Sequence, residues 1–450
     1  MNIVIFTDAF LPKIDGVGIS IDGFCRILSA RGHNFVICAP QYGKKDNEIE
    51  SEENGIRIIR FKNVALPSYP DVKIALPSRK NIKKAMETFP ADLIHIQTPG
   101  LMGRYGVRVA KTRDLPLIGT YHTLVSEQDM YVSAYRLLKL DKILERFRSR
   151  KKIKNRLKKI ERKDSGALRK KIIKKLCYRL YESCDLILSP SRRIKEELRK
   201  DGIANRIQVL SNGMDFSLFR NRARVLHNPS APAFLHVGRI SHEKNCEIVL
   251  KAFALIREKL PRATLSIVGD GPALTSMKIE AALLAPGDSV AFSGFIPHEN
   301  LPEIYRQHDI YLTASAMETQ GLTTLEALGC ALPAVGVDAF ALPELIVHGK
   351  SGFIVQPFDH IAMAARALEI LETPGLYERL SRGALEVAGK HELGACADRL
   401  EKIYADLIQP DSSGSDYQEN DCPVGEARKE SSEIDLIHAA PRETSAAFLA

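Results

Sequence analysis

Short apolar runs alternate with amphipathic segments along most of the chain, in two successive sets. The first set of runs, each typical of a buried strand, covers residues 2–6, 34–38, 56–61, 92–96, 116–121 and 185–189. The second set covers residues 234–238, 264–269, 289–292, 309–313, 333–337 and 352–355. Apolar residues recur at helical spacing between strands, over 245–258, 323–330 and 361–373. The alternation predicts an α/β protein with two doubly wound, Rossmann-like domains that face a cleft, each a parallel sheet covered on both faces.

A polar connector over 211–232 separates the two sets of strands. We therefore predict an N-terminal domain over 1–215 and a C-terminal domain over 216–392. A further helical pattern follows, which we assign to 393–408, and the pattern does not indicate which domain this helix contacts. Residues 409–450 are rich in Ser, Gly, Asp and Glu, so we expect a disordered tail there.

The composition is that of a globular protein, since 45% of the 450 residues are hydrophobic. The eight cysteines show no CxxC spacing and most lie in apolar runs, which favours buried free thiols over disulfides or a metal site. The first residues, MNIVIFTDAF, lack the charged start and the cleavage site of a signal peptide. The best candidate for a membrane span, 329–347, contains two prolines and two acidic residues. We therefore expect a cytoplasmic protein without a transmembrane helix.

Positive charge is concentrated in one segment of the predicted N-terminal domain. The net charge is +9, and residues 136–179 hold 20 Lys and Arg against four acidic residues, a local +16 that leaves −7 for the remainder. Because apolar residues recur there at helical spacing, we predict a basic amphipathic insert over 136–180. Such a helix suits an anionic membrane surface, which would make the protein peripheral on the cytosolic face of the cell membrane. A solvated charged helix is the alternative, and nucleic acid is not expected because no aromatic platform interleaves the charges.

Two loops at the ends of predicted strands carry residue types that bind phosphate. Gly16 and Gly18 follow the first strand just before a helix, where glycine lets the backbone approach an anion that the helix dipole favours. A plain turn is the alternative. Arg239 and Lys244 follow the strand 234–238, where a forked guanidinium and an ammonium suit a diphosphate. Their alternative is a role as ordinary surface cations, and the glycine-rich turn over 268–274 is either structural or faces a ligand.

Glu318 and Glu326 lie eight positions apart and could be taken for an acid/base pair. In one continuous helix they would be about 12 Å apart along the axis and about 80° apart around it, which argues against a shared site. Gln320 and Gly321 instead indicate a loop, with a helix starting near Leu322. Glu318 would then face the cleft and Glu326 would lie on the helix. The free amides of the first helical turn would meet an anion.

The segments that carry these residues resemble the nucleotide-sugar site of the retaining glycosyltransferases of family 4, which have the GT-B fold. The resemblance rests on METQGLTTLEALGCALPAV, GRISHEKN, VGDGP and YRQHDIYLTAS. It extends to FTDAFLPKIDGV, DLIHIQTPG, GTYHT and VLSNGMD, so it covers nearly all of residues 1–408 in the right order. The sequences of the motifs ETQGLTTLEAL and GTYHT are most similar to those of the diacylglycerol glucosyltransferases, which make membrane glycolipids.

The resemblance implies a role for each matching residue. Glu318 would hold the hexose hydroxyls, Glu326 would hold the ribose hydroxyls, and His122 of GTYHT would contact the sugar and the reacting centre. The loop around Gly16 and Gly18 departs from the family, because it reads DGVG where many relatives have paired glycines. The implied catalytic residues are His122 and Glu318. The implied donor-binding residues are Gly16, Arg239, Lys244, Glu318, Gly321, Leu322 and Glu326.

The implied reaction moves a hexose, with glucose from UDP-glucose as the expected donor, onto diacylglycerol or a related membrane lipid with retention of configuration. The partners would be a nucleotide sugar and a lipid acceptor. With two cations at the diphosphate, no metal and no other cofactor is expected. An α-mannosyl- or other hexosyltransferase acting on phosphatidylinositol, a lipid-linked oligosaccharide or a soluble sugar phosphate is the alternative within this class. A non-catalytic lipid-surface scaffold is a further alternative, which the complete set of site residues argues against.

Overall fold

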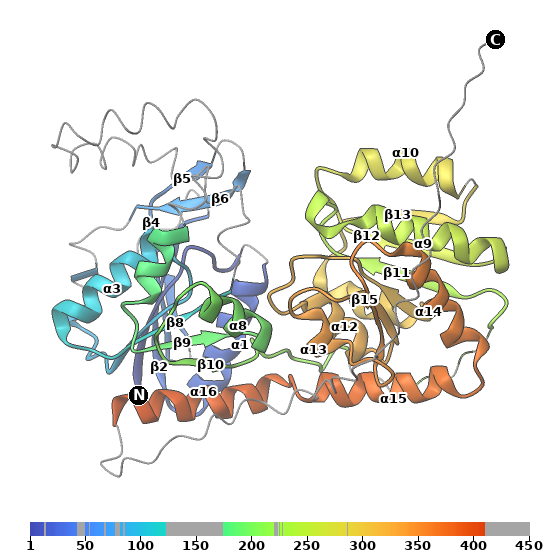
Figure 1. Ribbon diagram of the computed structural model, residues 1–450. Coiled ribbons are helices and arrows are strands. Elements are labelled where there is room, and N and C mark those ends of the chain that lie inside the picture. The colour runs from blue at the N-terminus through green and yellow to red at the C-terminus, as the bar shows by residue number, and fades with distance from the viewer. Residues whose placement is uncertain are drawn as a thin grey trace, which may run out of the picture.

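The structure is a computed structural model of the whole chain (Figure 1). It describes residues 1–12, 15–42, 50–53, 55–66, 69–76, 82–83, 86–122, 174–219, 224, 226, 228–285 and 287–409. The predicted basic insert therefore lies outside the described residues except for its last positions, 174–180, and so does the predicted tail from residue 410 onward.

The first sheet has eight strands in the order β10-β9-β8-β7-β1-β2-β4-β3, all parallel except the edge strand β3. Its strands are β1 (Asn2–Phe6), β2 (Asn34–Pro40), β3 (Glu50–Glu53), β4 (Ile56–Phe61), β7 (Leu93–Ile96), β8 (Leu117–Thr120), β9 (Leu186–Ser189) and β10 (Ile207–Val209). The six predicted strands are confirmed within two residues at each end. Two strands of this sheet were not predicted, since β10 has only three residues and β3 is wholly polar. A separate hairpin, β5 (Asn63–Leu66) with β6 (Tyr69–Ala75), was not predicted either.

The second sheet is parallel throughout and has the order β13-β12-β11-β14-β15-β16. Its strands are β11 (Ala233–Val237), β12 (Thr264–Val268), β13 (Val290–Gly294), β14 (Ile310–Leu312), β15 (Ala334–Val337) and β16 (Gly352–Val355). All six were predicted. The helices that follow these strands are α9 (Cys246–Lys259), α10 (Leu274–Leu284), α11 (Leu301–Arg306), α12 (Leu322–Gly329), α13 (Leu342–Leu345) and α14 (His360–Glu372).

Each sheet has a hydrophobic core on both faces, as continuous apolar strands require. In the first domain, α3 (Leu101–Arg113) and α8 (Arg192–Lys200) pack on one face, and α1 (Gly16–Ala30) packs on the other. In the second domain, α9, α10 and α14 share one core, and α11 and α12 share the other. The seven cysteines among the described residues are buried free thiols, as predicted.

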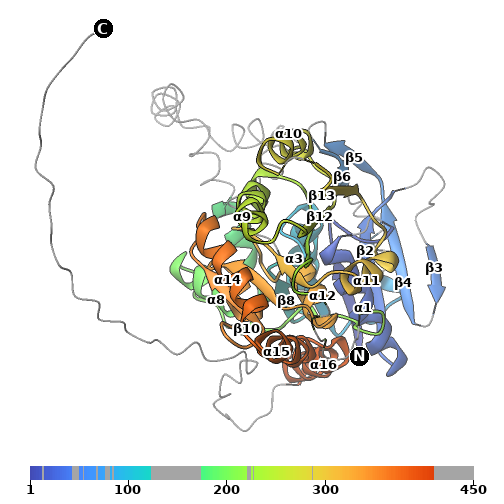
Figure 2. The same cartoon turned by 90° about the vertical axis from the view of Figure 1, so that its right-hand side faces the viewer.

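The chain crosses between the domains twice, because its last helix returns to the first domain. The helix α15 (Leu376–Gly389) packs beneath the second domain, and α16 (Leu393–Ile408) continues beneath the first (Figures 1 and 2). The apolar face of α16 joins the core formed by α1, β1 and β2. Arg31 at the end of α1 forms ion pairs of 2.6 Å with both Asp398 and Glu401 of α16. The sequence pattern did not indicate which domain this helix contacts, and the structure shows that it packs on the first.

The chain passes between the domains once near Met214 and once near Glu392. These two crossing segments lie side by side and are joined by backbone hydrogen bonds. The amide of Met214 donates to the carbonyl of His391 at 2.9 Å, and the amide of Leu393 donates to the carbonyl of Met214 at 2.9 Å. Gly213 has a φ of +67°, and a Cβ at this position would lie 2.6 Å from Cδ1 and 3.2 Å from Cα of Leu393. A side chain at Gly213 would therefore force the crossing segments apart.

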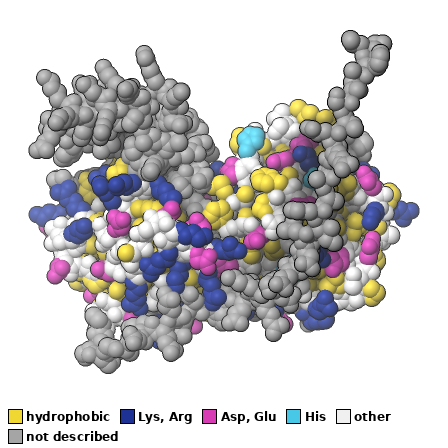
Figure 3. Space-filling model, viewed as in Figure 1, with side chains coloured by type: hydrophobic (Ala, Val, Ile, Leu, Met, Phe, Trp, Pro, Cys, Tyr) yellow, Lys and Arg dark blue, Asp and Glu magenta, His cyan; other side chains and the backbone are white. Residues whose placement is uncertain are grey.

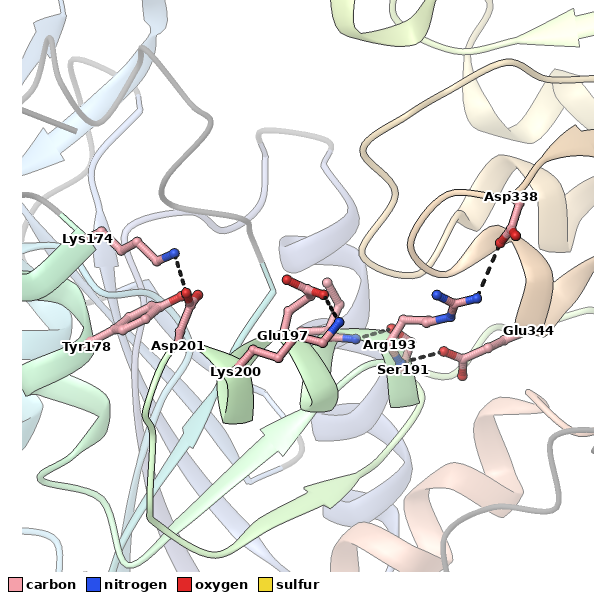
Figure 4. A network of polar contacts seen from close by, with 10 residues as sticks. Lys174, Tyr178, Ser191, Arg193, Glu197, Lys200, Asp201, Asp338 and Glu344 are labelled. Atoms are coloured by element: carbon pink, nitrogen blue, oxygen red, sulfur yellow. Dashed lines mark hydrogen bonds and ion pairs between the residues drawn. The ribbon is translucent and has the colours of Figure 1, made fainter. Parts of the chain in front are cut away.

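A second contact joins the domains at the start of α8 (Figure 4). The carboxylate of Glu344, on α13, accepts hydrogen bonds from the amides of Arg192 at 3.0 Å and Arg193 at 2.8 Å. The guanidinium of Arg193 also lies 3.3 Å from the carboxylate of Asp338. A carboxylate at a helix N-terminus satisfies amides that have no partner within the helix. The second domain therefore caps a helix of the first.

Replacing Gly213 by Ala is expected to lower the stability of the protein more than the same change at Gly375. Both glycines have left-handed backbones, with φ of +67° and +71°, which cost an alanine roughly 1–2 kcal/mol. Only Gly213 would also meet another segment, since nothing lies within 4 Å of a Cβ at Gly375. The midpoint of thermal unfolding, followed by circular dichroism, measures both variants. Equal losses would show that the crossing tolerates a side chain.

Candidate active site

The carboxyl ends of β11 and β14 bring two predicted loops together. Because these strands are neighbours in the sheet, the loop after β11 lies against the loop after β14. The side-chain amide of Asn245 donates to the carbonyl of Ala314 at 3.1 Å, and the amide of Ala316 donates to the carbonyl of Glu243 at 3.3 Å. This is the edge of a parallel sheet at which ligands bind in α/β proteins.

Lys244 and Glu318 meet at this edge. The ammonium of Lys244 lies 2.5 Å from the carboxylate of Glu318, and the two side chains are 21% and 16% exposed. The guanidinium of Arg239 forms no hydrogen bond or ion pair with any residue that the structure describes. Lys244 is therefore paired with the predicted sugar-binding carboxylate, and Arg239 lies on the loop that leads to Lys244. A ligand that carries both phosphate and hydroxyl groups could engage all three.

The helix α12 begins at Leu322, as predicted, and its start faces the first domain. Gly321 has a left-handed backbone, with φ of +83°, and caps the helix without a side-chain hydrogen bond. The first amides of such a helix lack internal acceptors and favour an anion. A Cβ at Gly16, in the first domain, would lie 2.7 Å from Cδ1 of Leu322. The amide of Gly18, by contrast, is used locally, because it donates to the Asp15 carboxylate at 2.8 Å.

Glu326 is buried on α12 and has partners different from those of Glu318. Its carboxylate accepts from the hydroxyl of Tyr305 at 2.7 Å and lies 3.2 Å from Nε2 of His298. The hydrogen bond with Glu326 raises the pKa of His298, against the effect of partial burial. The two glutamates thus sit in separate environments.

His122 lies at the carboxyl end of β8 and is only 8% exposed. Its Nε2 is 2.6 Å from Oε1 of Gln97, and its carbonyl accepts from the hydroxyl of Thr319 at 2.8 Å. Burial lowers the pKa of His122 to about 4, and the nearby Asn212 side chain partly opposes this shift. The imidazole is therefore neutral near pH 7. The backbone of His122 is joined through Thr319 to the loop that carries Glu318.

Several polar residues around the site were not predicted to belong to it. The buried Gln320 accepts from the amide of Asn212 at 2.9 Å and donates to the Ser211 hydroxyl at 2.6 Å, which links the site to the first crossing segment. The hydroxyls of Ser241 and Ser315 are buried and have no hydrogen-bond partner among the described residues. Because Ser241 and Ser315 lie in the loops that carry Arg239 and Glu318, the sequence could have indicated that they belong to the site. Unpartnered buried hydroxyls are costly, which is consistent with a ligand that satisfies them.

The part of the chain that the structure describes contains no group of three or more His, Cys, Asp and Glu side chains that could hold a metal ion. No helix in the same residues has the length and hydrophobicity needed to cross a membrane.

Two family models match the chain in consecutive segments. The model described as Glycosyltransferase Family 4 matches residues 14–218, and the model described as Glycosyl transferases group 1 matches residues 219–387. The chain is 25% identical over 433 residues to an alpha-monoglucosyldiacylglycerol synthase of Streptococcus pneumoniae, covering 94% of this chain and 89% of that protein.

Solved structures share the fold at low sequence identity. The sucrose-phosphate synthase of Thermosynechococcus elongatus superposes with a TM-score of 0.68 at 20% identity, covering 90% of this chain and 98% of that one. An Anabaena protein, HepE, in complex with UDP has a TM-score of 0.64 at 17% identity, covering 90% of this chain and 100% of that one.

The free energy of unfolding is expected to decrease as the pH is lowered from 6.5 to 4. Burial lowers the pKa of His95 to about 3 and the pKa values of His122 and His391 to about 4. The unfolded chain therefore binds protons in this range that the native state does not, and each group contributes about 1.4 kcal/mol per pH unit. Urea unfolding followed by circular dichroism at several pH values measures the slope. His122→Gln should reduce the slope, whereas replacement of the exposed His242 should not. An unchanged slope in His122→Gln would contradict the neutral state of His122.

Proposed function

Because the chain belongs to glycosyltransferase family 4, a family of retaining hexosyltransferases with the GT-B fold, we propose that it transfers glucose from UDP-glucose to diacylglycerol or a related membrane lipid. The observation that carries the proposal is the ion pair of Lys244 with Glu318 at the carboxyl edge of the second sheet, beside a loop that also carries Arg239. Cations and a carboxylate side by side fit a ligand that joins a diphosphate to a polyhydroxylated sugar.

In this proposal the donor lies between the two domains. Arg239 and Lys244 bind the diphosphate, and the amides at the start of α12, near Gly321 and Leu322, face the same group. Gly16 allows the backbone of the first domain to approach Leu322 closely, since a Cβ there would lie 2.7 Å from Cδ1 of Leu322. Donor binding would draw Lys244 toward the phosphates. The ion pair between Lys244 and Glu318 would then weaken, and the carboxylate of Glu318 would accept hydrogen bonds from the hexose hydroxyls.

The buried Glu326 would bind the ribose hydroxyls from the other end of α12. Its hydrogen bonds to Tyr305 and His298 fix the orientation of the carboxylate. His122 would contact the sugar from the first domain, and Thr319 links it to the donor loop.

The proposed reaction breaks the bond between the anomeric carbon and the diphosphate oxygen, and the electron pair stays on the diphosphate. The oxygen of the acceptor hydroxyl forms a bond to the anomeric carbon on the same face, so configuration is retained. The hydroxyl proton leaves with the diphosphate. Arg239 and Lys244 stabilise the negative charge that grows on the departing group.

The lipid acceptor is supported by the relative in Streptococcus pneumoniae, whose name states that it is a glucosyldiacylglycerol synthase, at 25% identity. Charge on the first domain is also consistent with a membrane surface. Lys and Arg side chains are prominent on the described surface of this domain in Figure 3, and α8 alone carries five of them in RRIKEELRK. The predicted insert over 136–180 would add further positive charge.

A panel of nucleotide sugars against acceptors tests the proposal. We expect labelled glycolipid from UDP-glucose with vesicles that contain diacylglycerol. GDP-mannose, phosphatidylinositol and sugar phosphates belong in the panel, because Glu318 would hold glucose or mannose through similar hydroxyls. Absence of a labelled lipid with every donor would rule out the lipid-transferase function.

Lys244→Ala should abolish transfer, since the diphosphate would lose a cation. Lys251→Ala is the matched control, because Lys251 also pairs with a glutamate, Glu280, at 3.7 Å but lies on α9. Near-normal turnover by Lys244→Ala would refute its role at the diphosphate.

Replacing six of the lysines between 151 and 175 by glutamine should weaken binding to anionic vesicles. Each Lys or Arg near such a surface contributes about 1 kcal/mol, and salt screens the attraction. Sedimentation with phosphatidylglycerol-containing vesicles at several salt concentrations measures the effect. If the variant binds these vesicles as the wild type does at every salt concentration, the lysines of the insert do not bind the membrane.

A further inference from the structure

A row of buried polar side chains connects the C-terminal helix to His122. The hydroxyl of Tyr404, on α16, lies 2.7 Å from Nδ1 of His95, and Nε2 of His95 lies 2.7 Å from the hydroxyl of Thr120. Gln97 stands between His95 and His122. His95 and Gln97 come from β7 and its carboxyl end, Thr120 and His122 from β8 and its carboxyl end, so neighbouring strands hold the row together.

The orientation of the Gln97 amide follows from its contact with His95. Nε2 of Gln97 lies 3.3 Å from each ring nitrogen of His95, although both nitrogens already have hydroxyl partners. Equal distances to both nitrogens place this amide nitrogen over the face of the imidazole. An N–H group over an aromatic face is attracted to it, whereas an amide oxygen there would be repelled. The oxygen of Gln97 is therefore the atom directed at His122.

A carbonyl oxygen can only accept a hydrogen bond, so the contact of 2.6 Å requires a proton on Nε2 of His122. In the neutral ring this leaves Nδ1 as an acceptor with a free lone pair. Nδ1 is buried and no described residue meets hydrogen-bond geometry with it, although the side chain of Asn212 is close enough to the ring to raise its pKa. A buried acceptor without a partner is costly, which indicates that a ligand supplies the missing donor.

We propose that Gln97, held in place by His95 and by Tyr404 of the C-terminal helix, fixes His122 in the tautomer that accepts a hydrogen bond from a substrate hydroxyl at Nδ1. The inference rests on the proposed function, in which His122 contacts the sugar. Gln97 and Tyr404 are positioning residues, since they act through the ring. The return of α16 to the first domain thereby becomes part of the active site.

The tautomer can be measured directly in the full-length chain without substrate. Long-range proton–nitrogen NMR of protein labelled with ¹⁵N-histidine distinguishes a protonated from an unprotonated ring nitrogen, and His122→Gln identifies the signals. We expect a protonated Nε2 and an unprotonated Nδ1. Gln97→Met, which removes the acceptor, should lose this pattern. A proton on Nδ1 in the wild type, shared with the nearby side chain of Asn212, would overturn the inference.

Kinetics of Tyr404→Phe test the far end of the row. Loss of the hydroxyl should lower kcat by about tenfold or more and leave the KM for the nucleotide sugar unchanged, because an orienting interaction is lost and not a donor contact. Tyr377→Phe is the matched control, since Tyr377 is also buried but its hydroxyl has no partner among the described residues. Equal kinetics for the two variants would overturn the role of Tyr404.

The two proposals fail in different ways. If the wild type transfers no sugar with any donor or acceptor, the proposed function fails, and the NMR experiment still decides the tautomer. If the wild type is active but Gln97→Met keeps both its kcat and the wild-type tautomer, the inference about Gln97 fails and the proposed function stands.

Discussion

Two backbone hydrogen bonds, between Met214 and the residues on either side of Glu392, join the segments that cross between the domains. They require the close approach of Gly213 to Leu393, which a side chain at Gly213 would prevent. The candidate site as a whole depends on this junction, because its residues are divided between the two domains. The carboxyl edge of one sheet carries His122, and the edge of the other carries Lys244 and Glu318. Without a fixed junction, these edges would hold no common ligand.

The two halves of the site differ in their electrostatics. The second domain provides positive charge, through Arg239, Lys244 and the start of α12, where the proposed reaction would place the departing diphosphate. The first domain provides a neutral imidazole, since burial lowers the pKa of His122 to about 4. A positive His122 would add to the cations already present, and a neutral one can accept a hydrogen bond from a hydroxyl. In the proposed function, the buried imidazole of one domain would recognise the sugar and the cations of the other would recognise the phosphates.

Most of the fold was predictable because both sheets are parallel and buried on both faces. Strands such as Ile3–Ile5 and Ala334–Val337 must then be continuously apolar, and the pattern is visible in the sequence. The strands that were missed lack this pattern, because β3 reads ESEE at the edge of the sheet and β10 has three residues. The start of α12 at Leu322 was predictable from Gly321, since a left-handed residue at a helix start favours glycine.

The sequence by itself determined the order of the strands along the chain, the loops that would carry Arg239, Lys244, Glu318 and His122, and the separation of Glu318 from Glu326, because these depend on local spacing. Only the tertiary structure decided that α16 returns to the first domain, that Lys244 pairs with Glu318, and that Gln97 orients His122. Each of these joins residues that lie far apart in the chain. Their contacts are set by which strands are neighbours and how the domains meet, and no local pattern of residues encodes that.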